Sequence, residues 1–211
     1  MPGSTSNDSS HQVSSSSHEL TTPFMLVSRQ TIIAMGIHAL HGIGSDSICN
    51  VCIANGGSCC QGCRHLVNGI GCQKRNTSCT AWLCGFLKFF LYETGLLREW
   101  NDFWDQVPGQ DYREDFTPEV FYVTKSLHLP DLRNLSEALA MDLHELAKSH
   151  IAIGFIITLR EKLDKYIDQL NECQHNRKKK NKLKRNIKVL SSPFHRFQKE
   201  LHNYRQKFPN S

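Results

Sequence analysis

The stretch from Cys49 to Cys84, CNVCIANGGSCCQGCRHLVNGIGCQKRNTSCTAWLC, holds eight of the nine cysteines of a 211-residue chain. Turn-forming glycines and asparagines recur through it, and it offers few apolar side chains from which a core could form. Because so little apolar surface can be buried here, we expect the segment to need a crosslink through its thiols to become ordered. The use of these thiols therefore decides both the fold of this segment and most of what the sequence says about function.

The spacing of the cysteines, C-x2-C-x6-C-C-x2-C-x8-C-x6-C-x4-C, favours a metal site. The pairs Cys49/Cys52 and Cys60/Cys63 each have a two-residue gap, which lets two thiolates bind one ion from a tight turn. Zinc is the predicted metal, and an iron–sulfur cluster is the alternative, since both accept all-thiolate sites. Eight thiolates could complete two four-cysteine sites, or one site with further thiols nearby. The predicted ligands are Cys49, Cys52, Cys59, Cys60, Cys63, Cys72, Cys79 and Cys84.

Two other uses of the thiols stay open, namely a disulfide framework and packed or redox-sensing free thiols. A disulfide framework requires an oxidising compartment, and the N-terminus lacks the basic and apolar regions of a secretory signal. No segment reaches the roughly 20 apolar residues of a transmembrane helix. The predicted location is therefore the cytoplasm, where clustered CxxC pairs are more often metal ligands than disulfides.

The cysteine pattern resembles a family of small cysteine-cluster proteins described as zinc- or iron-chelating domains. That family combines CxxC and a CC pair with a later CxxL, a further Cys, an Arg and another Cys. The resemblance covers about 36 residues and implies metal chelation, without a defined reaction. The matching positions are Cys49, Cys52, Cys59, Cys60, Cys63, Leu66, Cys72, Arg75 and Cys79.

Apolar residues at helical spacing predict a mainly α-helical protein, a helical bundle that carries the loop-rich cysteine module. We expect helices over 24–41, over 78–107 with a break or kink at Gly95, and from Thr117 to Pro130. A long helix is expected from Ser136 to about Cys173, with Gly154 able to divide it. A last amphipathic helix should follow Ser192-Pro193.

Composition divides the chain into four predicted parts. Residues 1–22 are a Ser-rich tail that we expect to be disordered, and 23–110 form the metal-binding module with its supporting helices. Residues 111–176 form a helical region with one long helix. Residues 177–211 form a basic connector and the C-terminal amphipathic helix.

Positive charge is concentrated at the C-terminal end. From Arg177 onward there are 12 basic residues and one acid, giving +11, whereas the preceding residues carry 13 basic and 19 acidic residues, giving −6. Such a cluster attracts phosphate without sequence specificity, so nucleic acid or an acidic protein is a candidate partner, the alternative being a solvated charge run. The candidate nucleic-acid residues are Arg177, Lys178, Lys179, Lys180, Lys182, Lys184 and Arg185.

No paired carboxylates, nucleophile–histidine motif or phosphate-binding loop indicates an enzyme, so whether the chain catalyses a reaction is left open. The favoured function is metal binding, with a zinc ion or iron–sulfur cluster that is mainly structural. One alternative is an iron–sulfur oxidoreductase or modifying enzyme. The other is a nucleic-acid-associated accessory protein that uses the basic C-terminal tail on DNA or RNA.

Overall fold

A computed structural model of the chain describes residues 24–59, 63, 65–67, 71–72, 75–111, 114–150, 152, 154–173 and 176–208. The predicted Ser-rich tail therefore lies outside the described residues. The described part is mainly α-helical, as predicted. Its helices are α1 (Arg29–Gly42), α2 (Ser45–Ala54), α3 (Thr77–Ala81), α4 (Gly85–Glu93), α5 (Leu97–Trp104), α6 (Arg133–Ser149), α7 (Phe155–Glu172), α8 (Arg177–Leu190) and α9 (His195–Lys207).

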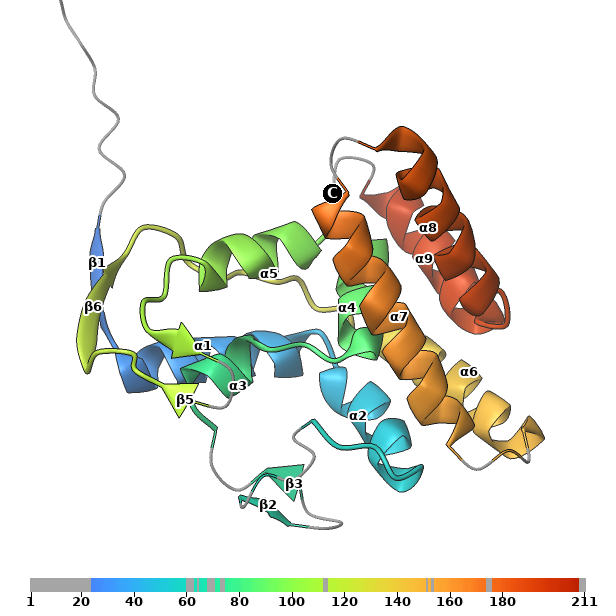
Figure 1. Cartoon of the computed structure of the whole chain (residues 1–211), viewed down its shortest axis with the longest axis horizontal. Helices are drawn as coiled ribbons and strands as arrows, with labels where there is room; N and C mark the ends of the chain where they lie inside the picture. The colour runs from blue at the N-terminus through green and yellow to red at the C-terminus, as the bar shows by residue number, and fades with distance from the viewer. Residues whose placement is uncertain are drawn as a thin grey trace, which may run out of the picture.

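Short antiparallel strand pairs supplement the helices. Strand β1 (Met25–Ser28) pairs with β6 (Val120–Val123), so that Met25 lies opposite Val123 and Ser28 opposite Val120. This ribbon lies beside the start of α1, at the left of Figure 1. The other described pairs are two residues per strand: β2 (Leu66–Val67) with β3 (Gly71–Cys72), and β4 (Gln110–Asp111) with β5 (Glu114–Asp115).

Helix α4 supplies the centre of the core. Its residues Phe86, Phe89 and Phe90 are almost fully buried. Phe89 makes an edge contact with Phe194 and a tilted contact with Phe197 at the start of α9. Burying aromatic side chains of this size is among the largest favourable contributions to folding. The contact explains why the C-terminal hairpin of α8 and α9 lies against the rest of the molecule (Figure 1).

Helices α4 and α7 cross at very close range. A Cβ atom built on Gly85 would lie 2.0 Å from the carbonyl oxygen of Arg160, so only glycine fits at the start of α4. One turn further along, the Lys88 Nζ atom lies 2.8 Å from Asp164 and 2.7 Å from Asp168. Burial opposes protonation of Lys88, but the two carboxylates outweigh it and raise its pKa above the ordinary value.

A buried carboxylate joins α6 to α9. Asp142, which is 2% exposed, accepts hydrogen bonds from the Phe197 backbone N–H at 2.9 Å and from the Arg196 guanidinium at 3.0 Å. A buried charge is tolerated where it is paired and hydrogen-bonded in this way. The pairing fixes the direction in which the C-terminal helix leaves Phe194.

Several predicted helix boundaries are wrong. The single helix expected over 78–107 is three helices, α3, α4 and α5, with the break at Gly95 present as a left-handed residue (φ +79°). No helix begins at Thr117, because the following residues form β6 and pair with β1. Helix α6 begins at Arg133, so Ser136 does not cap it; the Ser136 hydroxyl instead donates to the Ile43 carbonyl.

Gly154 divides the long helix that is expected from Ser136 to about Cys173. The sequence leaves this division open as an alternative. Gly154 adopts φ +82° between α6 and α7, a conformation that favours glycine. The run Arg177–Arg185, expected to be a charged connector, is part of helix α8, which extends to Leu190. Leu183 and Ile187 are buried where α8 packs on α7, and this tertiary contact outweighs the repulsion within the charge run.

Candidate metal centre

The first CxxC pair lies on a helix, and not in the tight turn that its spacing suggested. Cys49 and Cys52 occupy the second half of α2, one turn apart, so their side chains share a face of the helix. Cys52 is buried and Cys49 is partly buried. The expectation of a loop-rich module is wrong at this point, because Ile48 and Cys52 supply buried residues that hold α2 against its neighbours.

The chain reverses over Cys52 immediately after α2. Gly56 adopts φ +81°, and the Gly57 N–H donates to the Cys52 carbonyl at 2.8 Å. A Cβ atom on Gly57 would lie 2.3 Å from the Cys52 sulfur, so the glycine backbone is in contact with the thiol. This turn carries the chain to Ser58 and Cys59 beside α2.

Arg160 of α7 links the α2 thiol to the returning loop. Its guanidinium donates to the Cys52 sulfur at 3.6 Å and to the Ser58 carbonyl at 3.1 Å. The Arg160 side chain is only 14% exposed, and its ion-pair partner is Glu161, 3.8 Å away and 65% exposed. A buried guanidinium is stable only beside an anionic or strongly accepting group, and here the best-placed group besides the carbonyl is a cysteine sulfur.

Cys84 reaches the same region from the start of α4. It occupies the N-cap position, directly before Gly85, whose Cα is pressed against the Arg160 carbonyl. Burial raises the pKa of the Cys84 thiol to about 12; the Leu87 N–H lowers it, and the charges of Cys59 and Cys52 raise it.

The thiols of Cys49, Cys52, Cys59 and Cys84 form what we call the four-thiol cluster. Burial raises the pKa of Cys49 far above its ordinary value, and the charges of Cys84, Cys59 and Cys52 raise it further. Thiols that affect one another's ionisation lie in one region of the molecule, although α2 and α4 are about thirty residues apart in sequence. A cation among them would reverse the repulsion and favour the thiolate forms.

The described residues do not form a finished coordination site. Among them, no three His, Cys, Asp or Glu side chains lie close enough to hold one metal ion. Binding by the four-thiol cluster therefore requires its sulfur atoms to move closer together than they lie in the structure. The chemistry of the donors fits zinc, which accepts four thiolates in a tetrahedral site.

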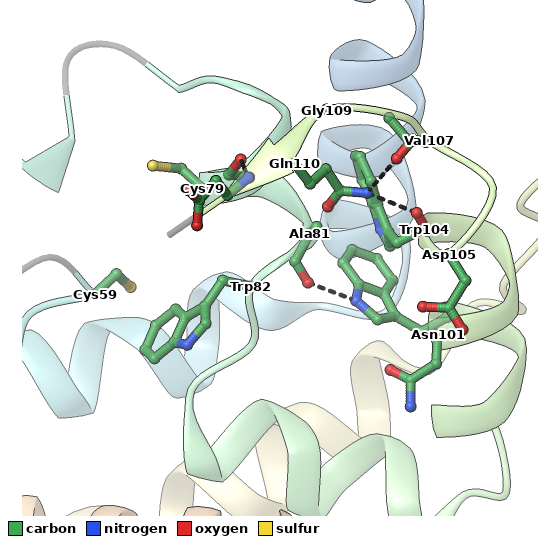
Figure 2. Close-up of a pocket in the computed structure, with 13 residues that line it drawn as sticks. Cys59, Cys79, Ala81, Trp82, Asn101, Trp104, Asp105, Val107, Gly109 and Gln110 are labelled. Carbon is green, nitrogen blue, oxygen red and sulfur yellow. Dashed lines mark hydrogen bonds between the residues drawn. The ribbon is translucent and has the colours of Figure 1, made fainter. Parts of the chain in front are cut away.

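The other predicted ligands are placed differently. Cys79 lies on α3 and lines a pocket of about 630 Å³ together with Cys59 and three tryptophans, Trp82, Trp100 and Trp104. Figure 2 shows Cys59 and Cys79 on the same side of that pocket, away from Trp104.

The remaining cysteines between residues 60 and 72 are described only in part. Cys63 is partly buried, Cys60 lies outside the described residues, and of Cys72 only the backbone, in β3, is described. Cys173, which is not a predicted ligand, is buried at the C-cap of α7. Within the described part of the chain, Cys49, Cys52, Cys63, Cys79, Cys84 and Cys173 are not in disulfides.

Sequence reasoning missed Arg160. Nothing in the pattern of α7 distinguishes this basic residue from others on the same helix. It reaches the Cys52 thiol only because α7 packs across the start of α4 in the folded chain. The seven predicted nucleic-acid residues, in contrast, are all exposed on α8.

Comparisons with known proteins give no match for the chain. No family model matches it, and no curated protein or solved structure is significantly similar to it. The resemblance to the cysteine-cluster family stays a prediction. None of the described helices alone has the length and apolar character of a membrane span. Helices α1 and α2, which meet at an angle of 84°, together have the length and apolar composition of a broken span, and nothing beyond length and composition supports that reading.

Proposed function

We propose that this protein binds a single zinc ion through the thiolates of Cys49, Cys52, Cys59 and Cys84, and that the ion has a structural role. The observation that carries the proposal is the convergence of three separate segments on Arg160. The Arg160 guanidinium donates to Cys52 at the end of α2 and to Ser58 in the returning loop, and the Arg160 main-chain carbonyl lies against Gly85 at the start of α4. Each of the three segments contributes thiols of the four-thiol cluster.

Charge supports this assignment. Four thiolates around Zn²⁺ carry a net charge of −2. Cys52 and Cys84 are buried, Cys49 is partly buried and Cys59 is exposed, so part of this charge would lie away from water and would be costly there without a cation nearby. The Arg160 guanidinium supplies such a cation and already donates to the Cys52 sulfur. The Ser58 carbonyl and the exposed Glu161 carboxylate are its other partners, and a metal–thiolate group would add a stronger, charge-assisted acceptor than a neutral thiol.

The position of the cluster explains a structural role. It would tie the C-terminal end of α2, the loop at Cys59 and the N-terminus of α4 into one unit. Zinc contributes on the order of 10 kcal/mol to the folding of small zinc-binding domains, which is comparable with the whole stability of an average protein. The same ion would order the turn-rich segment that follows α2.

Metal analysis of cysteine variants tests the proposal. The full-length protein, purified anaerobically without added metal, should contain about one zinc per chain by elemental analysis. Cys52→Ser and Cys84→Ser should each lose most of it, while Cys173→Ser and Cys79→Ser, the matched controls, should keep it. Retention of zinc by Cys84→Ser at the level of the unmodified protein would refute the ligand set.

The same preparation identifies the metal. A brown protein with iron and acid-labile sulfide would replace zinc by an iron–sulfur cluster at these ligands. Treatment with a chelator under reducing conditions should lower the melting temperature and the helical circular dichroism. Unchanged melting after complete metal removal would show that the ion is not structural.

A further inference from the structure

Helix α8 presents a cationic face that is not balanced within the described part of the molecule. It contains no acidic residue, and all eight of its basic side chains are exposed. None of the ion pairs found among the described residues involves α8, whereas Arg196 and Arg205 of the adjacent α9 pair with Asp142, Glu145 and Glu93. The basic residues of α8 are Arg177, Lys178, Lys179, Lys180, Lys182, Lys184, Arg185 and Lys188.

This arrangement destabilises the helix that carries it. Like charges repel at the i, i+4 pairs Lys178/Lys182, Lys180/Lys184 and Lys184/Lys188, each by a few tenths of a kcal/mol. The first turn holds cations and no acid, although the positive end of the helix dipole favours anions there. A charge pattern that costs stability in the isolated protein becomes favourable when a polyanion lies against it.

The helix is held firmly enough to act as a surface. The Asn176 side chain caps it by accepting the Lys179 N–H at 3.0 Å, and Leu183 and Ile187 are buried against α7. Two rows of cations then face outward, one of Lys178, Lys182 and Arg185 and one of Arg177, Lys184 and Lys188. Each row is about 10–17 Å long at 1.5 Å per residue.

We infer that this face of α8 binds the phosphate backbone of a nucleic-acid duplex without reading its sequence. Duplex DNA carries one charge per roughly 1.7 Å of axis, a density that two rows of cations on a rigid rod can match at several points. In Figure 1, α7 lies between α8 and α2, so this binding is separate from the proposed metal site.

Other polyanions fit less well. A membrane-surface helix needs an apolar face to insert, and α8 buries its apolar side chains on α7, leaving Val189 as its one large exposed hydrophobic residue. Single strands are bound largely by stacking of bases on aromatic side chains, and α8 has none. A duplex needs neither feature, only regularly spaced cations.

The salt dependence of binding tests this inference. Fluorescence anisotropy with labelled duplexes of DNA and of RNA, between 50 and 200 mM salt, should give a log–log slope of about −5 for six phosphate contacts. Lys178→Gln, Lys182→Gln and Arg185→Gln combined should reduce the magnitude of the slope by about 3, at about 0.9 for each phosphate that is no longer neutralised. The control combination, with equal charge loss on α6 and α7, is Lys148→Gln, Lys162→Gln and Lys165→Gln, and it should leave the slope nearly unchanged.

Several outcomes would overturn the inference. The first is that the unmodified protein binds neither duplex at 50 mM salt. The second is that the control combination reduces the salt slope as much as the α8 combination does. The third is that the protein binds single strands, anionic phospholipid vesicles or polyglutamate more tightly than it binds a duplex. Circular dichroism and zinc content should match the unmodified protein in both variants. The slope of the unmodified protein is a test that needs no variant.

Discussion

Replacing Gly85 by alanine is expected to force α4 and α7 apart. The new Cβ would lie 2.0 Å from the Arg160 carbonyl oxygen, 2.7 Å from the Asp164 nitrogen and 2.9 Å from the Asp164 Cβ. Ordinary contact requires about 3.4 Å or more, so the backbones must separate by over 1 Å. Overpacking of this kind typically costs about 1–3 kcal/mol, and here the clash is with main-chain atoms that cannot rotate away.

The loss of stability in Gly85→Ala is the difference between two opposing contributions. Alanine gains up to about 1 kcal/mol over glycine within a helix, which offsets part of the clash, although less at the first position of α4. A net destabilisation of about 2 kcal/mol is therefore expected, equivalent to a fall in melting temperature of about 4–8 °C for a chain of this length. Because Cys84 precedes Gly85, we also expect a reduced zinc content.

The assay is urea unfolding followed by circular dichroism, alongside elemental analysis. Gly42→Ala is the matched control, since Gly42 also lies in a helix and a Cβ there meets nothing within 4 Å. The control should be as stable as the unmodified protein or slightly more stable. If Gly85→Ala were as stable as Gly42→Ala, the close crossing of α4 and α7 at Gly85 would be wrong.

Three further perturbations follow from the described contacts. Burial opposes ionisation of Asp115, but hydrogen bonds from Thr77 and Thr117 outweigh the burial and lower the pKa of this carboxyl. The ionised Asp115 therefore stabilises the fold fully at pH values above the pKa it has in the unfolded chain, and this stabilisation is lost as the pH falls through the lower pKa of the folded state. Asp115→Asn should cost about 1–3 kcal/mol at pH 7 and little in acid, as measured by urea unfolding at several pH values. Gly57→Ala places a methyl group on the Cys52 sulfur and should reduce zinc content more than it reduces helix content. Asp142→Ala removes a buried carboxylate that accepts two hydrogen bonds from α9, and should cost about 3 kcal/mol with reduced protection from hydrogen exchange in α9.

For each of these three variants, one result would contradict the expected effect. If Asp115→Asn lowered the free energy of unfolding equally at pH 7 and in acid, the charge of Asp115 would not be what stabilises its contacts with Thr77 and Thr117. Gly56→Asn, in which a residue tolerated at positive φ meets nothing within 4 Å, is the control for Gly57→Ala and should keep its zinc. Equal protection of α9 in Asp142→Ala and in the unmodified protein would show that the carboxylate does not hold that helix.

The patterns that local physics controls were predicted correctly. Apolar side chains at helical spacing in α4, α5 and α7 form helices, and glycines at 95 and 154 break them, because glycine alone adopts positive φ at little cost. The assignment of the dense cysteines to a metal site stays a prediction, and the structure places four of them in the four-thiol cluster. The exposure of the basic residues on α8 also agrees with their charge.

Contacts between distant segments decided the rest. Thr117-Pro118-Glu119 has the residues of a helix start, yet the next residues pair with β1, about ninety positions earlier, and hydrogen bonding across that ribbon outweighs the local preference. The basic run became a helix because Leu183 and Ile187 found an apolar surface on α7. Spacing alone could not show which cysteines converge, since Cys84 joins Cys49 and Cys52 only through the crossing of α4 with α7, where Gly85 and Arg160 touch. The sequence by itself therefore determined helical content and the chemistry available, and the tertiary packing alone decided which side chains meet, because that depends on contacts between residues far apart in the chain.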